Sequence, residues 1–236
     1  MLHLIEMKIA IIGNGGSVLD REHGEFIDSC DTVIRMKQYV TDGYEEYTGT
    51  KVDVYVSKWF SWFDNFKPYN PKDMSHVMNV DEYWFMFCDP NVDHNISSEY
   101  SKLYLKYALK CDVPQKNGSL DMHNENIDLF NIPRNKIRYY PIEYIEQLSS
   151  KLKLPTTTIL DKKGNETIIE PSVGLRTIHQ AINVYPNDDI YVTGFDCFLE
   201  SSWYWNSNHV INNDHNYLSE KIYLEILTKT NKVIQL

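Results

Sequence analysis

A histidine and a glutamate near the end of the sequence have the types and the spacing that proton transfer requires. His215 and Glu220 stand at the start of a predicted helix, directly after a long polar and aromatic stretch. An imidazole accepts a proton near neutral pH, so His215 is the candidate general base. We expect Glu220 either to orient His215 or to hold the preceding stretch in place. The remaining histidines lack such a context.

A glycine-rich turn follows the first predicted strand and contains Gly13, Asn14, Gly15 and Gly16. Glycines let the backbone approach a ligand closely, and the N–H groups of a strand-to-helix turn can hold an anion. The Asn14 amide can donate to a phosphate oxygen. A dinucleotide fingerprint would need a third glycine where Val18 stands, and an acidic residue at the end of the next strand. The turn therefore predicts a phosphate site of another kind.

Two more segments carry residues suited to binding a charged nucleotide. Ser172 and Gly174 begin a predicted helix, where the helix dipole and free N–H groups can hold an anion and Ser172 can also cap the helix. Tyr204 can donate a hydrogen bond to a departing phosphate, with packing inside its own stretch as the alternative. The chain has no Asp-x-Asp motif, so we expect a reaction without a bound metal.

The composition is that of an ordinary globular chain with an acidic surface. The 236 residues are 42% hydrophobic and carry a formal net charge of -10, which disfavours a general nucleic-acid-binding surface. No apolar run approaches the ~20 residues that span a bilayer, and the first residues do not resemble a signal peptide. The four scattered cysteines favour reduced thiols and a cytoplasmic location. Frequent Lys, Asn and Tyr indicate an AT-rich coding sequence, as in bacteriophages and some bacteria.

Short apolar runs alternate with helical patterns along the chain. Strands are predicted at 8–13, 31–36, 51–56, 83–88, 136–140, 189–194 and 232–235. Helices are predicted at 97–110, 141–153, 173–184 and 215–228, with Ser172 and Asp214 as N-caps. This alternation predicts an α/β protein with a mostly parallel sheet covered on both faces. We expect a hairpin insertion at about 156–170 and an active-site lid at about 196–214.

Three motifs in this order resemble those of the sialyltransferases. Residues 8–53, with "GNGGSVLD", "DTVIRMK" and "GYEEYTGTK", resemble the long sialylmotif. "PSVGLRTIHQAINVYPNDDIYVTGFD", at 171–196, resembles the short sialylmotif. "HNYLSE", at 215–220, resembles the family's His-x4-Glu element, and the bacterial lipooligosaccharide sialyltransferases have a similar pattern. The shared order of the motifs makes the resemblance specific over about 8–60 and 170–228.

The resemblance implies a fold, a reaction and a set of site residues. It implies one Rossmann-like glycosyltransferase domain over 1–236 with a flexible lid. This domain would move a sugar from a CMP-activated donor to a hydroxyl, with inversion and without a cofactor or metal. The catalytic residues would be His215, Glu220 and Tyr204. The donor-binding residues would be Gly13, Asn14, Gly15, Gly16, Arg35, Lys37, Ser172, Gly174 and Gly194.

The sequence departs from the family pattern at two places. Lys37 stands where the family motif has an Asn that is expected to touch the nucleotide, so the identity of the donor is open. The cysteines that link the two sialylmotifs in the animal enzymes are missing around Met7 and Val184, which fits a reducing compartment.

The acceptor is predicted from residues 58–72, where six aromatic residues accompany three lysines and one aspartate. Aromatic rings can stack on a sugar or a base, and Lys can meet phosphates, although core packing is the alternative for most of the rings. Lys58, Trp59 and Trp62 are the acceptor-binding candidates. A glycan hydroxyl is the leading acceptor, with a hydroxymethylated base of phage DNA as the second. A nucleotide-binding protein without transferase activity is the third reading.

Overall fold

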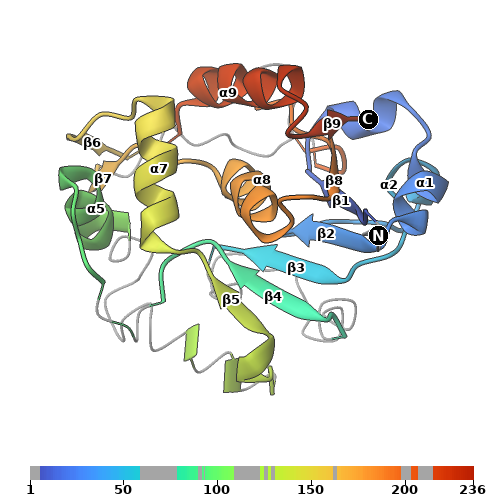
Figure 1. Cartoon of the computed structure of the whole chain (residues 1–236), viewed down its shortest axis with the longest axis horizontal. Coiled ribbons are helices and arrows are strands. Elements are labelled where there is room, and N and C mark those ends of the chain that lie inside the picture. The colour runs from blue at the N-terminus through green and yellow to red at the C-terminus, as the bar shows by residue number, and fades with distance from the viewer. Residues whose placement is uncertain are drawn as a thin grey trace, which may run out of the picture.

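A seven-stranded parallel sheet organises the protein. The computed structural model describes residues 6–58, 79–89, 92, 94–108, 123–124, 127–128, 131–161, 164–197, 203–206 and 215–236. The strands are β1 (Lys8–Ile12), β2 (Thr32–Met36), β3 (Val54–Ser57), β4 (Glu82–Phe85), β5 (Ile137–Tyr139), β8 (Asp189–Thr193) and β9 (Ile234–Gln235). Their order in the sheet is β5-β4-β3-β2-β1-β8-β9, as Figure 1 shows for most of it. The predicted α/β fold with a parallel sheet is confirmed.

The central strand β1 marks the point where the direction of winding reverses. It pairs in parallel with β2 on one side and with β8 on the other, so that Ile11 faces Ile34 and Val192. The chain runs outward from β1 to β5 and then returns to the other side of β1 with β8 and β9. In open α/β sheets, ligands bind at such a reversal, outside the carboxyl ends of the strands. The glycine turn at 13–16 lies at this end of β1.

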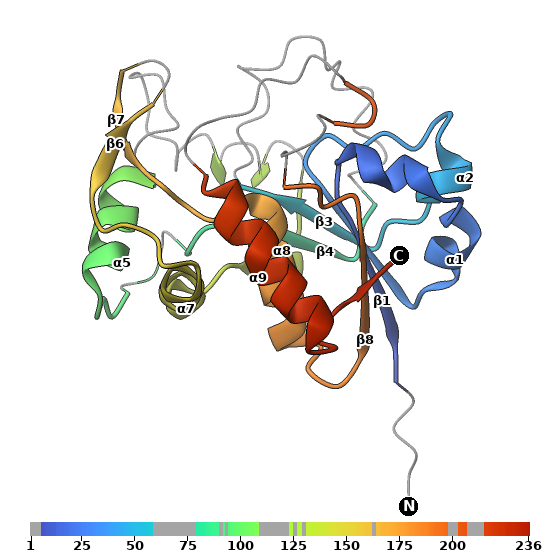
Figure 2. The same ribbon diagram turned by 90° about the horizontal axis from the view of Figure 1, so that it is seen from above.

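The alternating side chains of β1 build a core on each face of the sheet. Ile9 and Ile11 belong to the cluster that contains apolar residues of α7 (Ile142–Leu152), α8 (Val173–Val184) and α9 (Tyr217–Lys229). Ala10 and Ile12 belong to the cluster that contains Ile27 of α1 (Gly24–Ser29). Figure 2 shows α7, α8 and α9 on one side of β1, and α1 with α2 (Glu45–Thr48) on the other. Both faces of the parallel sheet are therefore covered, because neither is polar enough to face water.

Most predicted elements are present, with some differences at their ends. The strand predicted from residue 51 starts only at Val54. The Lys51 N–H donates to Asp28 Oδ1 at 2.8 Å and so does not pair with a neighbouring strand. The helix predicted at 97–110 contains α5 (Glu99–Leu103) and continues as a π-helix over Tyr104–Ala108. The short helices α1 and α2 and the 3-10 turns at Gly16–Asp20 and Arg134–Lys136 were not predicted, since a helix of one or two turns has too few residues to show a period.

The predicted hairpin and helix caps have mixed outcomes. β6 (Thr158–Leu160) and β7 (Glu166–Ile168) pair in antiparallel, which confirms the hairpin. Ser172 caps α8, because its hydroxyl accepts from the Leu175 N–H at 3.2 Å. The prediction of Asp214 as a cap is wrong: α9 begins two residues later than expected, and the Asn216 side chain accepts from the Ser219 N–H.

Two predicted functional segments lie largely outside the described residues. Of the lid predicted at 196–214, the structure describes 196–197 and 203–206. Trp59 and Trp62, two of the acceptor-binding candidates, fall outside the described residues. Within the described part of the chain, no helix has the length and apolar character needed to cross a membrane.

Candidate active site

The glycine turn packs directly against the end of β8. The N–H groups of Gly13 and Gly15 donate to the carbonyls of Thr193 and Gly194, both at 2.8 Å. A Cβ atom on Gly13 would lie 2.2 Å from the Gly194 carbonyl oxygen, so the two backbones touch without room for a side chain. Gly194 itself has a φ of +73°, a conformation that favours glycine. These two amides therefore already have acceptors at the end of β8, and donor binding by the glycine turn stays a prediction.

The carboxylate of Asp196, which follows β8, accepts hydrogen bonds from the first turn of the short 3-10 helix after the glycine turn. The Ser17 N–H donates to Asp196 Oδ2 at 3.1 Å, and the Ser17 hydroxyl donates to Asp196 Oδ1. A Cβ atom on Gly15 would lie 2.6 Å from the same carboxylate. Asp196 thus takes the position where a bound anion was expected, and the glycines of the turn serve the approach of β8 to β1.

Asn14 presents an acceptor where a donor was expected. Its amide nitrogen donates to the carbonyls of Met36 and Gln38, at 3.2 and 3.3 Å, which defines the orientation of the amide. The side chain is 7% exposed, and its Oδ1 atom has no hydrogen-bond partner among the described residues. A buried carbonyl oxygen without a donor is costly, so this position fits the hydroxyl or amine group of a ligand.

Arg35 supports the loop beside the site. Its guanidinium is fully buried and donates to the main-chain carbonyls of Thr48 at 2.6 Å and Lys51 at 2.8 Å. Burial lowers the pKa of this guanidinium from its ordinary value. In the structure Arg35 orders the end of α2 and the loop after it, and its predicted contact with the donor stays a prediction. Lys37, the second predicted donor-binding residue on this strand, follows β2 with a φ of 53° and stays a prediction.

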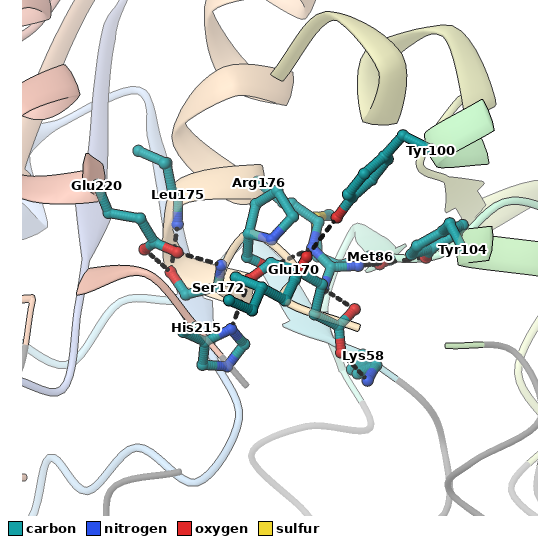
Figure 3. Close-up of polar contacts among 12 residues, drawn as sticks. Lys58, Met86, Tyr100, Tyr104, Glu170, Ser172, Leu175, Arg176, His215 and Glu220 are labelled. Carbon is teal, nitrogen blue, oxygen red and sulfur yellow. Dashed lines mark hydrogen bonds and ion pairs between the residues drawn. The ribbon is translucent and has the colours of Figure 1, made fainter. Parts of the chain in front are cut away.

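Glu220 holds the N-terminus of α8. Its carboxylate accepts from the Ser172 N–H at 2.7 Å and from the Ser172 hydroxyl at 2.6 Å (Figure 3). Burial raises the pKa of Glu220 above its ordinary value, against the lowering effect of nearby His215 and the bonds from Ser172. These bonds hold the start of α8, and the two roles expected for Glu220, orienting His215 or holding the preceding stretch, stay predictions. The Ser172 hydroxyl donates to Glu220 and accepts from Leu175, so its direct contact with a donor stays a prediction.

The first turn of α8 keeps amide donors for a ligand. The N–H groups of Val173 and Gly174 have no hydrogen-bond acceptor among the described residues. Gly174 keeps this end narrow, since a Cβ atom there would lie 3.0 Å from the Phe195 ring. These free N–H groups stand at the positive end of the helix dipole, where an anion is stabilised.

His215 is held through one ring nitrogen. Its Nδ1 lies 2.7 Å from the main-chain oxygen of Glu170. A carbonyl can only accept, so Nδ1 carries a proton, and in the neutral ring the lone pair is then on Nε2. The ring packs edge to face on Tyr217, with centroids 5.5 Å apart. This tautomer is the one that a general base at Nε2 requires, and Figure 3 shows the bond from the His215 ring to the Glu170 main chain.

A buried ion cluster lies on the other side of Glu170. The Glu170 carboxylate is 2.5 Å from Lys58 Nζ and 2.6 Å from Arg176 Nη2. Burial opposes the ionisation of Glu170, but the nearby charges of Lys58, Arg176 and His215 lower its pKa to about 2. Lys58 was predicted to bind the acceptor, and the structure places it in this cluster.

Tyr204 packs the described part of the predicted lid onto the glycine turn. Its N–H donates to the Asn14 carbonyl at 2.9 Å, and Trp203 forms a bridge with Gly15. The Tyr204 hydroxyl accepts from the Val40 N–H at 3.1 Å and donates to the Val40 carbonyl. Its bonds therefore correspond to the packing alternative, and a contact with the leaving phosphate stays a prediction.

Sequence reasoning missed three residues of this site: Glu170, Arg176 and Asp196. A single signal existed for Arg176, which is charged although it lies among the apolar residues of a predicted buried helix. Glu170 and Asp196 carry no local pattern that separates them from surface carboxylates. Among the described residues, no group of three or more His, Cys, Asp or Glu side chains could hold a metal.

The structure defines an α/β protein in which a histidine is bonded to the segment that begins α8. The chain belongs to glycosyltransferase family 29, the sialyltransferases, whose family model matches residues 7–232. It is therefore a glycosyltransferase by family, and the predicted resemblance is confirmed.

Solved structures show the same fold. A mammalian sialyltransferase in complex with Gal-beta-1-3GalNAc-ortho-nitrophenol is similar with a TM-score of 0.53 and 16% identity, over 98% of this chain and 69% of that one. The monofunctional alpha-2,3-sialyltransferase Cst-I from Campylobacter jejuni is similar with a TM-score of 0.55 and 14% identity, over 100% of this chain and 78% of that one. A search of curated proteins found no match.

Proposed function

We propose that this family member transfers a sugar from a CMP-activated donor to a glycan hydroxyl, without a metal and with inversion. One observation carries the proposal: Glu170, whose carbonyl holds His215, lies two residues before Ser172, which caps α8. A general base and a group of free amide donors are thereby held side by side by one short segment. Direct displacement of a phosphate by a hydroxyl needs both.

The donor binds between the glycine turn and α8. The N–H groups of Val173 and Gly174 hold the anionic part of the donor at the positive end of the helix. Asn14 Oδ1, buried and without a partner among the described residues, accepts a hydrogen bond from a nucleotide hydroxyl or amine. This role replaces the donation to phosphate that the sequence suggested, since both hydrogens of the Asn14 amide have carbonyl acceptors.

The reaction is one displacement. His215 Nε2 removes the proton of the acceptor hydroxyl while its oxygen attacks the anomeric carbon, and the bond from that carbon to the phosphate oxygen breaks on the opposite face. The nucleotide leaves with the bonding electron pair and the configuration inverts. Donors at the α8 terminus stabilise the charge that develops on the phosphate, as a metal does in other transferases.

A glycan is the acceptor that the observations favour. The net charge of -10 repels a polyanion, and Lys58, one of the lysines that would meet DNA phosphates, pairs with Glu170. The mammalian relative was solved with a galactoside. Hydroxymethylated DNA is the alternative acceptor, to be compared with a galactoside in the transfer assay.

Ligand-dependent melting tests the donor. CMP at a hundredfold excess over its Kd should stabilise the protein by about 2.7 kcal/mol, in the presence of EDTA and more than UDP, GDP or NAD do. Transfer from CMP-sialic acid to a galactoside should persist in EDTA. Stabilisation by UDP-sugars that EDTA abolishes would contradict both the donor and the metal independence.

A further inference from the structure

Four consecutive residues, the 169–172 segment, are each held through the main chain by a different side chain. Tyr100 donates to the Ile169 carbonyl at 2.7 Å, and His215 donates to the Glu170 carbonyl at 2.7 Å. Arg176 Nε donates to the Pro171 carbonyl at 2.8 Å, and the Ser172 N–H donates to Glu220 at 2.7 Å. These bonds come from α5, from the residues before α9, from α8 and from α9. The 169–172 segment is thus held by side chains from four different parts of the chain (Figure 3).

The Glu170 side chain ties this segment to the sheet. Its carboxylate bridges Arg176 of α8 and Lys58, which directly follows β3. Arg176 is itself fixed, because its Nη1 donates to the Met86 carbonyl at 2.5 Å. The exposed fraction is 3% for Glu170 and 0% for Arg176, so water hardly screens this pair. Glu170 is therefore bound at two points. Its carboxylate pairs with Lys58 and Arg176, and its main-chain carbonyl accepts the hydrogen bond from His215.

We infer that Glu170 is a positioning residue for the general base, acting through the carbonyl that holds His215 in the Nδ1–H tautomer, and that Lys58 and Arg176 clamp it for this purpose. The inference rests on the proposed function for its effect on catalysis and not for its effect on the ring. Without the Glu170 carboxylate, Arg176 loses its ion pair, and because its Nε also holds the Pro171 carbonyl, its shift moves the neighbouring Glu170 carbonyl away from Nδ1. The proton then distributes between the two ring nitrogens, and the fraction of His215 with a lone pair at Nε2 falls.

The Glu170→Gln variant tests the inference, because it keeps the size of the side chain and its main-chain carbonyl. In nitrogen-15 NMR spectra of the imidazole, wild-type His215 should show the single Nδ1–H tautomer, and the variant a mixture. The kcat of transfer should fall about 10- to 100-fold, while KM for donor and acceptor stays within about twofold. CMP should still bind.

Two further variants separate positioning from loss of folding. Lys58→Met removes the more exposed partner and leaves the Glu170–Arg176 pair, so it should fold and show a smaller shift in the same direction. Glu82→Gln breaks the ion pair with Arg138 at the start of β4, at the end of the strand away from the site, and should change neither the tautomer nor kcat. If Glu170→Gln does not fold, Lys58→Met decides.

The ring spectrum and the kinetics distinguish the possible failures. An unchanged tautomer in folded Glu170→Gln or Lys58→Met overturns the inference, whatever happens to kcat. A mixed tautomer with unchanged kcat overturns the catalytic part of it. If His215→Ala also transfers normally, the proposed function of His215 fails, while the structural effect on the ring stands.

Discussion

At the scale of single residues, the site depends on which atom of each polar group remains for a ligand. The Asn14 amide donates its hydrogens to the Met36 and Gln38 carbonyls, and its Oδ1 atom has no hydrogen-bond partner among the described residues. His215 donates its Nδ1–H to the Glu170 carbonyl, so Nε2 is the ring nitrogen that would act as a base. The residue types alone allow either end of each group to face the substrate. Their hydrogen bonds select one end of each group, and the proposed function assigns Asn14 Oδ1 to a nucleotide group and His215 Nε2 to the proton of the attacking hydroxyl.

His215→Ala should lose transfer activity by roughly 10² to 10⁴ fold while CMP binding stays near that of the wild type. The reason is that a general base lowers the barrier of the chemical step and contributes little to the affinity for the donor. Steady-state kinetics and calorimetry with CMP measure the two effects. His94→Ala, a change at a histidine far from the 169–172 segment in the sequence, serves as the control. Normal turnover of His215→Ala would mean that another group takes the proton.

At the scale of elements, the site is held by the contact between the ends of β1 and β8. The Gly13 and Gly15 amides bond to Thr193 and Gly194, and this contact places the glycine turn against the neighbouring strand end. Glu220 forms a second connection, between α9 and the start of α8. Because His215 lies two residues before α9, this bond sets the place of the proposed base relative to the proposed donor site.

Gly13→Ala should destabilise the protein strongly, by roughly 1 to 3 kcal/mol or more, because a Cβ atom would lie 2.2 Å from the Gly194 oxygen. Backbone has to move to relieve that contact, so the bonds between the glycine turn and β8 should weaken as well. Urea unfolding measures the change in free energy, and amide hydrogen exchange at Gly15 reports on the bonds. Thr156→Ala, on the exposed approach to the hairpin, is a neutral control. A Gly13→Ala protein with wild-type stability would contradict the close approach of the two strands.

At the scale of the whole molecule, a buried charge cluster connects the sheet with the helices that cover one of its faces. Lys58 follows β3 of the sheet, Arg176 lies on α8, and Glu170 joins them. Breaking such a cluster leaves uncompensated buried charges, so its protonation state affects the stability of the entire fold.

The free energy of unfolding should therefore fall in acid, in a window defined by Glu170. The pKa of Glu170 is lowered from 4.5 to about 2 in the folded protein. A lowered pKa of a carboxyl contributes stability that is present above pH 4.5 and is lost as the pH falls toward 2. The contribution is on the order of 3 kcal/mol. Urea unfolding between pH 5 and 2.5 should show a shallower decline for Glu170→Gln than for the wild type, and equal slopes would contradict the assignment.

Much of the fold follows from local patterns in the sequence. Apolar runs such as Lys8–Ile12 and Asp189–Thr193 predict buried strands, since parallel strands need apolar side chains on both faces. Ser172 predicts its helix start, because a cap acts within three residues. The order of the three motifs predicts the family, which the family model confirms.

The tertiary structure alone decided how the site residues are used. Glu170 bonds to Lys58, 112 residues away, and to His215, 45 residues away, and no local pattern marks a carboxylate or a carbonyl for such partners. The N–H groups of the glycine turn were predicted to bind a phosphate. In the structure those of Gly13 and Gly15 donate to carbonyls at the end of β8, about 180 residues further along the chain. The residue types therefore determine which hydrogen bonds a group can form. Which of them remain for a substrate depends on the strand ends and helices that folding brings next to it.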